Sequence, residues 1–163
     1  PAIADAVTIP VLAAGGINDL RGVRAAFSLG AEGVYVGTRF IATDECAANA
    51  KTKELICRLS GANLLYVDET LRSLPTEFAA EAYVKHRLQP TVPTAVDTVA
   101  AMRTGMYDGD PDQGIVSVNT GIDVIHTVMP AEQVARELMG DFLRAASLLK
   151  AKSQAQDIAP EAP

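Results

Sequence analysis

The sequence predicts an α/β fold in which neighbouring strands run parallel. Residues 11–14 (VLAA) and 34–36 (VYV) are short apolar runs without alternation, which is typical of strands buried on both faces of a parallel sheet. Each run is followed by a glycine turn, Gly15-Gly16 after the first and Gly37-Thr38 after the second. The segment between them has a helical pattern, and strand, helix and strand in this order form the basic unit of a parallel sheet.

The connecting helix is expected over residues 19–29. Asn18 is a suitable N-cap and Gly30 a suitable stop. A helix of this length runs roughly 16 Å at about 1.5 Å per residue, so it can return the chain along the first strand and make the second strand parallel to it. Its apolar face comprises Leu20, Val23 and Phe27.

The two glycine turns are predicted to form one phosphate cradle. Right-handed crossovers bring the carboxyl ends of neighbouring parallel strands to the same edge, so the two turns should lie close together. Glycine lets the backbone approach a ligand closely, and a threonine hydroxyl adds a donor. In (β/α)8 barrels, the loops after the last two strands are a frequent phosphate site. A plain tight turn is the competing interpretation of Gly15-Gly16 taken alone. The predicted cradle residues are Gly15, Gly16, Gly37 and Thr38.

These residues resemble the nitronate monooxygenase family, formerly called 2-nitropropane dioxygenases. The resemblance rests on residues 10–17 (PVLAAGGI), 33–40 (GVYVGTRF) and 42–45 (ATDE). It is sharp over residues 8–45 and looser elsewhere. It implies the carboxyl-terminal part of a (β/α)8 TIM barrel, with FMN at the barrel mouth and the FMN phosphate held by the two glycine turns. The family also includes FMN-dependent enoyl-acyl-carrier-protein reductases.

Length and composition bound the remaining possibilities. The chain has 163 residues and opens at Pro1, whereas such barrels typically need about 250 residues. We therefore expect a missing amino-terminal part of the barrel. A net charge of −6 argues against a nucleic-acid partner, and no apolar run has the length of a membrane helix. Two cysteines are too few for a disulfide framework, and the cytoplasm is the expected location.

Residues 62–112 are predicted to form a small, mostly helical cap or substrate segment. It follows the barrel units of residues 1–61, which end in a helix over 44–59 capped by Thr43 or Asp44. The predicted cap elements are an extended piece at 64–67, a solvated turn at Asp68-Glu69-Thr70, a helix from Pro75 to Arg87, a linker at 89–93, a helix at 94–104 ending at Gly105, and a turn-rich loop at 107–112.

Residues 113–151 are expected to return to the barrel and end in a terminal helix. A helix is predicted near residues 122–128, and Pro130 occupies a suitable first position for the last helix. Residues 152–163 have the composition of a disordered tail. The expected buried face of the last helix comprises Val134, Leu138, Phe142, Ala145 and Leu149.

No residue of the chain is nominated as a catalytic base. His86 is expected to face solvent near a helix end, and His126 is expected to be a packed core histidine. The resemblance places the catalytic histidine of the family before the first glycine turn, in a segment that this sequence lacks. Cys46 and Cys57 are too far apart along one predicted helix to share a metal ion, so no metal site is expected.

Three further polar residues have two interpretations each. Arg39 could pair with a phosphate or form a salt bridge at the barrel rim. Arg72 lies where family members carry basic residues, but Ser73 to Thr76 depart from the family pattern. Asn119 or Thr120 is predicted to contact the flavin, because residues 117–121 occupy the place of a flavin-side loop in the family. A helix cap is the competing role for Asn119.

The first functional hypothesis is an FMN oxidoreductase that oxidises alkyl nitronates with oxygen. An NAD(P)H-dependent enoyl-thioester reductase is the sibling hypothesis within the same family. A hypothesis from a second class is a flavin-free barrel enzyme, in which the same cradle would bind a phosphorylated small-molecule substrate. A further hypothesis is that the chain alone is inactive and works only with the missing part of the barrel, since a partial barrel leaves strand edges unpaired. Homo-oligomerisation stays open.

Overall fold

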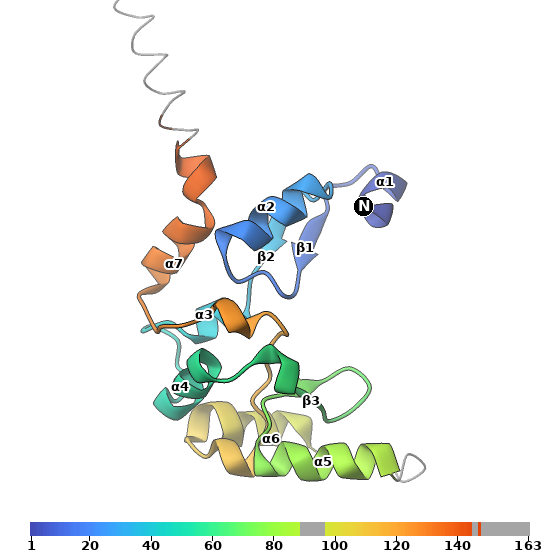
Figure 1. The fold of residues 1–163 in the computed structure, drawn as a ribbon, viewed down its shortest axis with the longest axis vertical. Helices are drawn as coiled ribbons and strands as arrows, with labels where there is room; N and C mark the ends of the chain where they lie inside the picture. Colours follow the sequence, from blue (N-terminus) through green and yellow to red (C-terminus); the bar gives the residue numbers. More distant parts are fainter. Residues whose placement is uncertain (89–96, 145–146, 148–163) are drawn as a thin grey trace, which may run out of the picture.

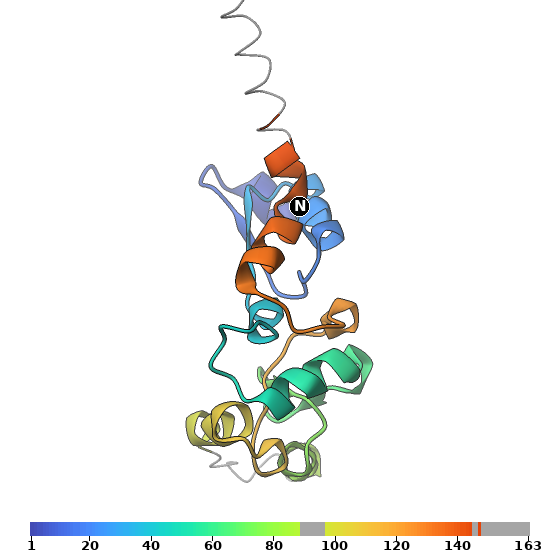
Figure 2. The same cartoon turned by 90° about the vertical axis from the view of Figure 1, so that its left-hand side faces the viewer.

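The computed structural model describes residues 1–88, 97–144 and 147. These residues are stacked along one long axis, with a small parallel sheet and helices α2 and α7 toward one end and helices α5 and α6 at the other (Figure 1). Helices α3 and α4 lie between the two ends, and a view turned by 90° shows the same order (Figure 2). A short helix, α1 (Ala2–Ala6), precedes the sheet.

The parallel crossover predicted from the sequence is confirmed. Strand β1 (Leu12–Ala14) pairs in parallel with β2 (Gly33–Tyr35), and α2 (Leu20–Ser28) connects them. Helix α2 ends before Gly30, whose φ of +96° is the left-handed conformation that favours glycine. The predicted N-cap was wrong by one residue, because the Asp19 side chain accepts the Gly22 N–H at 2.9 Å.

Only one face of this sheet is covered by the described chain. Helices α2 and α7 (Ala131–Leu138) pack on that face. On the opposite face Leu12 is 62% exposed and Tyr35 is 71% exposed. The prediction that both faces are buried is therefore wrong within the described residues, because nothing packs against the second face. The buried residues of the covered face are Ile17, Val23, Ala26, Val134 and Leu138.

After the sheet, the chain forms two helices where one was predicted. A short helix, α3 (Thr38–Ile41), follows β2, and α4 (Ala50–Arg58) begins at the N-cap Asn49. The predicted start of a helix at Thr43 or Asp44 was wrong. The Thr43 hydroxyl donates back to the Phe40 carbonyl at 2.7 Å, and residue 43 bridges Met129. Both contacts hold this stretch outside a helix.

The described part of residues 62–112 is mostly helical, as predicted, and also contains a short hairpin. A short 3₁₀ turn (Gly61–Asn63) leads into a hairpin of β3 (Leu65–Tyr66) and β4 (Arg72–Ser73), whose second strand was not expected. The predicted stop at Gly105 was wrong, since the chain continues there as a π-helical turn. The later elements are α5 (Glu77–Leu88), α6 (Thr98–Arg103), a π-helix (Thr104–Asp108) and a 3₁₀ turn (Pro111–Gln113).

Residues 114–130, called the return segment below, pass beside the hairpin before they reach the sheet. The Leu74 N–H donates to the Val116 carbonyl at 3.0 Å, and the Val116 N–H donates to the Ser73 hydroxyl at 3.0 Å. The helix predicted near 122–128 shortens to a 3₁₀ turn (Ile122–Val124). Helix α7 begins one residue after Pro130, which is its N-cap. Phe142 is half-exposed and packs against Phe27, with ring centroids 5.0 Å apart.

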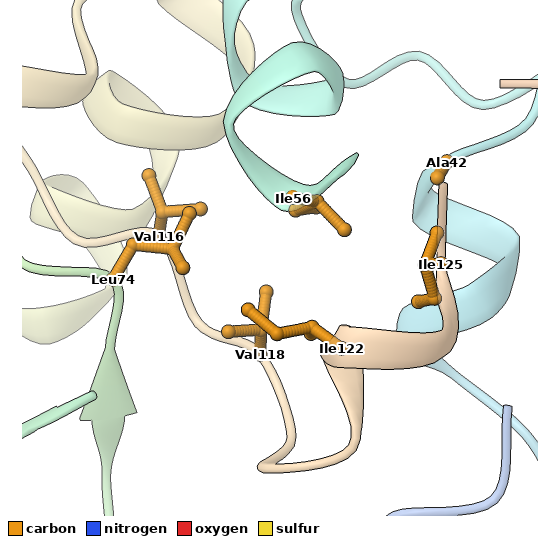
Figure 3. Packing of buried hydrophobic residues seen from close by; sticks show 7 residues of the cluster. All are labelled: Ala42, Ile56, Leu74, Val116, Val118, Ile122 and Ile125. Carbon is orange, nitrogen blue, oxygen red and sulfur yellow. The ribbon is translucent and has the colours of Figure 1, made fainter. Parts of the chain in front are cut away.

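A hydrophobic cluster joins α4, the hairpin and the return segment. Its side chains come from four separate stretches of the sequence and converge between α4 and the connection toward α7 (Figure 3). Such a shared core fixes the return segment against the elements on either side of it. The cluster comprises Ala42, Ile56, Leu74, Val116, Val118, Ile122 and Ile125.

Several predictions lie outside the described residues. These are the linker at 89–93, the first residues of the helix at 94–104, the disordered tail at 152–163, and the burial of Ala145 and Leu149. Within residues 1–88 and 97–144, none of the helices combines the length and the apolar character needed to cross a membrane.

Candidate functional site

The first glycine turn leaves its backbone open to a ligand. Gly15 and Gly16 have φ values of +91° and +70°, a conformation that L-residues with a Cβ adopt at a cost. A Cβ built on either residue meets no atom of the described chain within 4 Å, so space is free beside both. The same holds for Gly37 at the end of the second strand. The structure therefore places three of the four predicted cradle residues beside open space.

The fourth residue, Thr38, is held by the return segment. It is the first residue of α3, and only 8% of it is exposed. Its hydroxyl oxygen accepts the backbone N–H of Asn119 at 3.0 Å. Because a hydroxyl both donates and accepts, the Thr38 proton stays available to an acceptor.

Asn119 ties the return segment to the first turn through a pair of side-chain amides. The Asn18 amide donates to the Asn119 amide oxygen at 2.8 Å, and the Asn119 amide donates back to Asn18 at 3.1 Å. The Asn18 amide also donates to the Gly121 carbonyl at 2.7 Å, and the Gly121 N–H donates to Asn119 at 2.8 Å. These contacts assign Asn119 a positioning role. Its predicted flavin contact stays a prediction.

Gly121 packs directly against the first glycine turn. A Cβ at this position would lie 2.7 Å from the Gly16 carbonyl oxygen and 3.0 Å from the Asn18 amide nitrogen. The return segment can approach this closely only because residue 121 has no side chain. Residues near positions 16, 38 and 120 therefore meet at one place, although more than a hundred positions separate the first from the last.

The amide pair gives a direct test of this arrangement. Replacing Asn119 with leucine should cost about 2 kcal/mol of unfolding free energy, since it leaves the buried Asn18 amide short of partners. Asn18→Leu should cost a similar amount. In urea unfolding of both single variants and the double variant, we expect the double to lose less than the sum of the singles. Strict additivity would contradict the pairing.

The charged residues nearby take positions that the sequence did not reveal. Arg39 is 5% exposed and donates through Nη1 to the carbonyls of Ala42 (3.2 Å) and Thr127 (3.4 Å). The rim salt bridge proposed for it is not found among the described residues. His126 is exposed, so its predicted place in the core was wrong, because the expected helix around it does not form. His86 lies in the last turn of α5, as predicted.

The hairpin carries the predicted solvated turn. One Asp68 carboxylate oxygen accepts the backbone N–H groups of Thr70 and Leu71, each at 2.7 Å. These bonds lower the pKa of Asp68, which favours a structural turn over an acid/base pair with Glu69. Arg72 stacks over the Tyr66 ring at 5.0 Å, and its buried Nε has no hydrogen-bond acceptor in the part of the chain that the structure describes. No substrate contact of Arg72 follows from this geometry.

The two cysteines are free and partly buried. Burial raises the pKa of the Cys57 thiol, and the positive charge of Arg39 opposes part of that rise. Among the described residues, no three His, Cys, Asp or Glu side chains gather where they could hold a metal ion.

Cys57 is expected to resist alkylation in the native protein. Its raised pKa keeps the thiol protonated at neutral pH, so iodoacetamide should modify Cys57 more slowly in the native than in the urea-unfolded protein. Below the unfolded-state pKa of about 8.5 the Cys57 thiol is protonated in both states, and the shift contributes its full share to the free energy of unfolding. As the pH rises through the folded-state pKa, this contribution is lost. A Cys57→Ala variant should show a smaller loss over that range. Equal alkylation rates would contradict the expectation.

The family model of nitronate monooxygenase matches residues 1–141. The chain belongs to the nitronate monooxygenase family. Its identity to a probable nitronate monooxygenase of Staphylococcus haemolyticus is 39% over 82 residues, which is 48% of this chain and 23% of that protein. A second probable nitronate monooxygenase, from Bacillus subtilis, is 44% identical over 63 residues, or 39% of this chain and 18% of the relative.

Two solved structures resemble most of this chain. FabK from Thermotoga maritima matches with a TM-score of 0.76 and 29% identity, over 93% of this chain and 50% of FabK. A nitroalkane oxidase from Streptomyces ansochromogenes matches with a TM-score of 0.65 and 25% identity, over 90% of this chain and 43% of the oxidase. The chain thus spans half or less of the solved structures and less than a quarter of the curated relatives.

Sequence reasoning missed two residues of this site. Asn18 was interpreted as an N-cap, and Gly121 was not singled out. The available signal was Gly121, two positions after Asn119, because asparagine and glycine both favour turns. Only the long-range contacts place them beside the predicted cradle residues.

Proposed function

We propose that this chain forms the carboxyl-terminal part of a (β/α)8 barrel and binds the phosphate of FMN. The single observation that carries the proposal is the open space beside Gly15, Gly16 and Gly37 at the carboxyl ends of two neighbouring parallel strands. Exposed backbone at this edge suits a phosphate, which backbone N–H groups can bind without a side chain. Membership of a family that is flavin-dependent in general supports the same cofactor.

In this proposal the residues of the chain bind and orient, and the cofactor supplies the electron-accepting group. The phosphate would be held by backbone groups of Gly15, Gly16 and Gly37 and by the Thr38 hydroxyl. Asn119 holds the return segment against them through Asn18. The segment at residues 62–112 borders the substrate, and no catalytic base is assigned to this chain.

The reaction we propose is the oxidation of alkyl nitronates by oxygen. The family match and the two probable nitronate monooxygenases support it. An NAD(P)H-dependent enoyl-thioester reductase is the second candidate, favoured by the likeness to FabK, an enoyl-acyl-carrier-protein reductase. Oxygen consumption with a nitronate, measured beside NAD(P)H oxidation with an enoyl thioester, separates the two.

We further propose that the rest of the barrel pairs with the free edges of the β1–β2 sheet and covers its exposed face. Leu12 and Tyr35 expose apolar surface there, and each strand has one neighbour among the described residues. Open strand edges pair readily with further strands. On this view the chain alone lacks activity, and its activity depends on a polypeptide that supplies the preceding barrel strands.

A comparison of FMN with riboflavin tests the cradle. The two ligands share the ring system and differ by the phosphate. Titrations followed by flavin fluorescence, with the preceding barrel strands supplied, should give at least about tenfold tighter binding of FMN, since charge-assisted hydrogen bonds to phosphate contribute about 1.5–3 kcal/mol. Equal affinities would contradict a phosphate site. Binding of inorganic phosphate without either flavin would favour a flavin-free enzyme with a phosphorylated substrate.

A further inference from the structure

A cavity is lined by residues from the start of α2 and from α7. These two helices lie beside each other next to the small sheet (Figure 1). The volume of the cavity is about 500 Å³, within the range of small-molecule sites. The residues of its wall that matter here are Leu20, Arg39, His126, Met129, Val134 and Leu138. Neither the glycine residues of the cradle nor Thr38 lines it.

Arg39 is the charged group at this cavity that lacks a counter-ion. The side chain is 5% exposed, and among the described residues no carboxylate oxygen lies within 4.0 Å of it. Its two hydrogen bonds, to the Ala42 and Thr127 carbonyls, both use Nη1. A guanidinium has five N–H donors, so those on Nε and Nη2 have no acceptor in the described chain. Arg39 lines the cavity, so its side chain borders that space.

The other charges around the cavity have partners or lie at its rim. Arg21 pairs with Asp19 at 2.7 Å, and Arg24 makes a two-pronged pair with Asp141. Glu137 is exposed and accepts a hydrogen bond from Gln133 at 3.0 Å. A buried charge without a counter-ion is costly, so an anion beside Arg39 would be stabilised there.

The apolar part of the cavity wall favours an anion that carries an apolar group. Val134 and Leu138 are buried on α7, and Met129 adds a flexible apolar side chain. A fully hydrated anion gains nothing from such a wall, whereas an anion with a short apolar tail does. The planar guanidinium matches a carboxylate through two parallel hydrogen bonds.

We propose that this cavity binds a small organic monocarboxylate, with its carboxylate on Arg39 and its apolar tail against α7. The site is separate from the proposed phosphate cradle, although Asn18 lines the cavity and also holds Asn119 beside the cradle. The proposal does not depend on flavin binding or on nitronate oxidation.

The test is a titration of the protein with butyrate, followed by the methyl NMR signals of Met129 and Leu138. We expect a saturable shift of both signals. Butyramide, which has the same shape without the charge, should bind at least about tenfold more weakly, and so should inorganic phosphate, which lacks the tail. No saturable shift, or equal binding of butyramide or phosphate, would overturn the proposal.

Two arginine variants assign the contact. Arg39→Lys keeps the charge but loses the planar fork, and it should weaken butyrate binding about tenfold. Arg58→Lys is the matched control, because Arg58 is exposed on α4 and pairs with Glu54 away from the cavity. It should bind butyrate as the unmodified protein does. Unchanged binding in a folded Arg39→Lys protein would also overturn the proposal, and the wild-type titration decides the matter if that variant fails to fold.

Discussion

Replacing Gly114 with alanine is expected to destabilise the protein by about 3 kcal/mol. Gly114 is buried where the return segment crosses α6 and the π-helix that follows it. A Cβ there would clash with the Gly105 nitrogen and the Ala101 carbonyl oxygen, and it would lie 2.7 Å from the Gly105 Cα. All three are backbone atoms, so no side chain can rotate away to make room.

Urea unfolding followed by circular dichroism measures this effect. Gly140→Ala is the matched control, because its Cβ would meet only the end of the Leu20 side chain, at 3.5 Å. We expect the control to be as stable as the unmodified protein or up to about 1 kcal/mol more stable, because residue 140 is helical and alanine is a better helix former than glycine. If Gly114→Ala unfolds at the same urea concentration as Gly140→Ala, the close packing of the return segment is refuted.

Substitution of Gly16 by valine is expected to lower the affinity for FMN about a hundredfold, with a far smaller effect on riboflavin. The φ of +70° at Gly16 disfavours any side chain, at roughly 1–2 kcal/mol, and valine would fill the open space where we propose that the phosphate binds. Loss of the phosphate contacts adds to this cost. Flavin fluorescence titrations of both ligands, with the preceding barrel strands supplied, measure the difference.

Gly30 provides the control for backbone strain. It has a φ of +96° but follows α2, away from the glycine turns at the strand ends. Gly30→Ala should therefore reduce stability and leave the ratio of FMN to riboflavin affinity unchanged. If Gly16→Val weakens both flavins equally, the first turn is a folding element, and the cradle proposal fails at that residue.

The sequence predicted the elements whose cause is local. The parallel crossover followed from two apolar runs, one helical segment and the glycine at its end, all within residues 11–37. The turn at Asp68 followed from its composition, and the side chain does bond its own backbone neighbours. Such contacts join residues a few positions apart, so pattern and composition suffice to predict them.

The errors occurred where a distant segment competes with the local preference. Asn18 was expected to cap α2, but its amide is engaged by Asn119 and Gly121, and the adjacent Asp19 takes the cap. Thr43 was expected to start a helix, but Met129 bridges it. A preference worth about 1 kcal/mol for a cap is readily overridden by several long-range hydrogen bonds.

By itself, the sequence determined the family, the parallel strand order and the two glycine turns, because each rests on residues close together in the chain. Only the tertiary structure decided that Asn119 fastens the return segment to Asn18, that Gly121 packs on Gly16, and that Arg39 is buried with no counter-ion among the described residues. These properties belong to pairs of segments that meet through the shared core, and burial and hydrogen bonding at such a meeting depend on packing that no single stretch of sequence encodes.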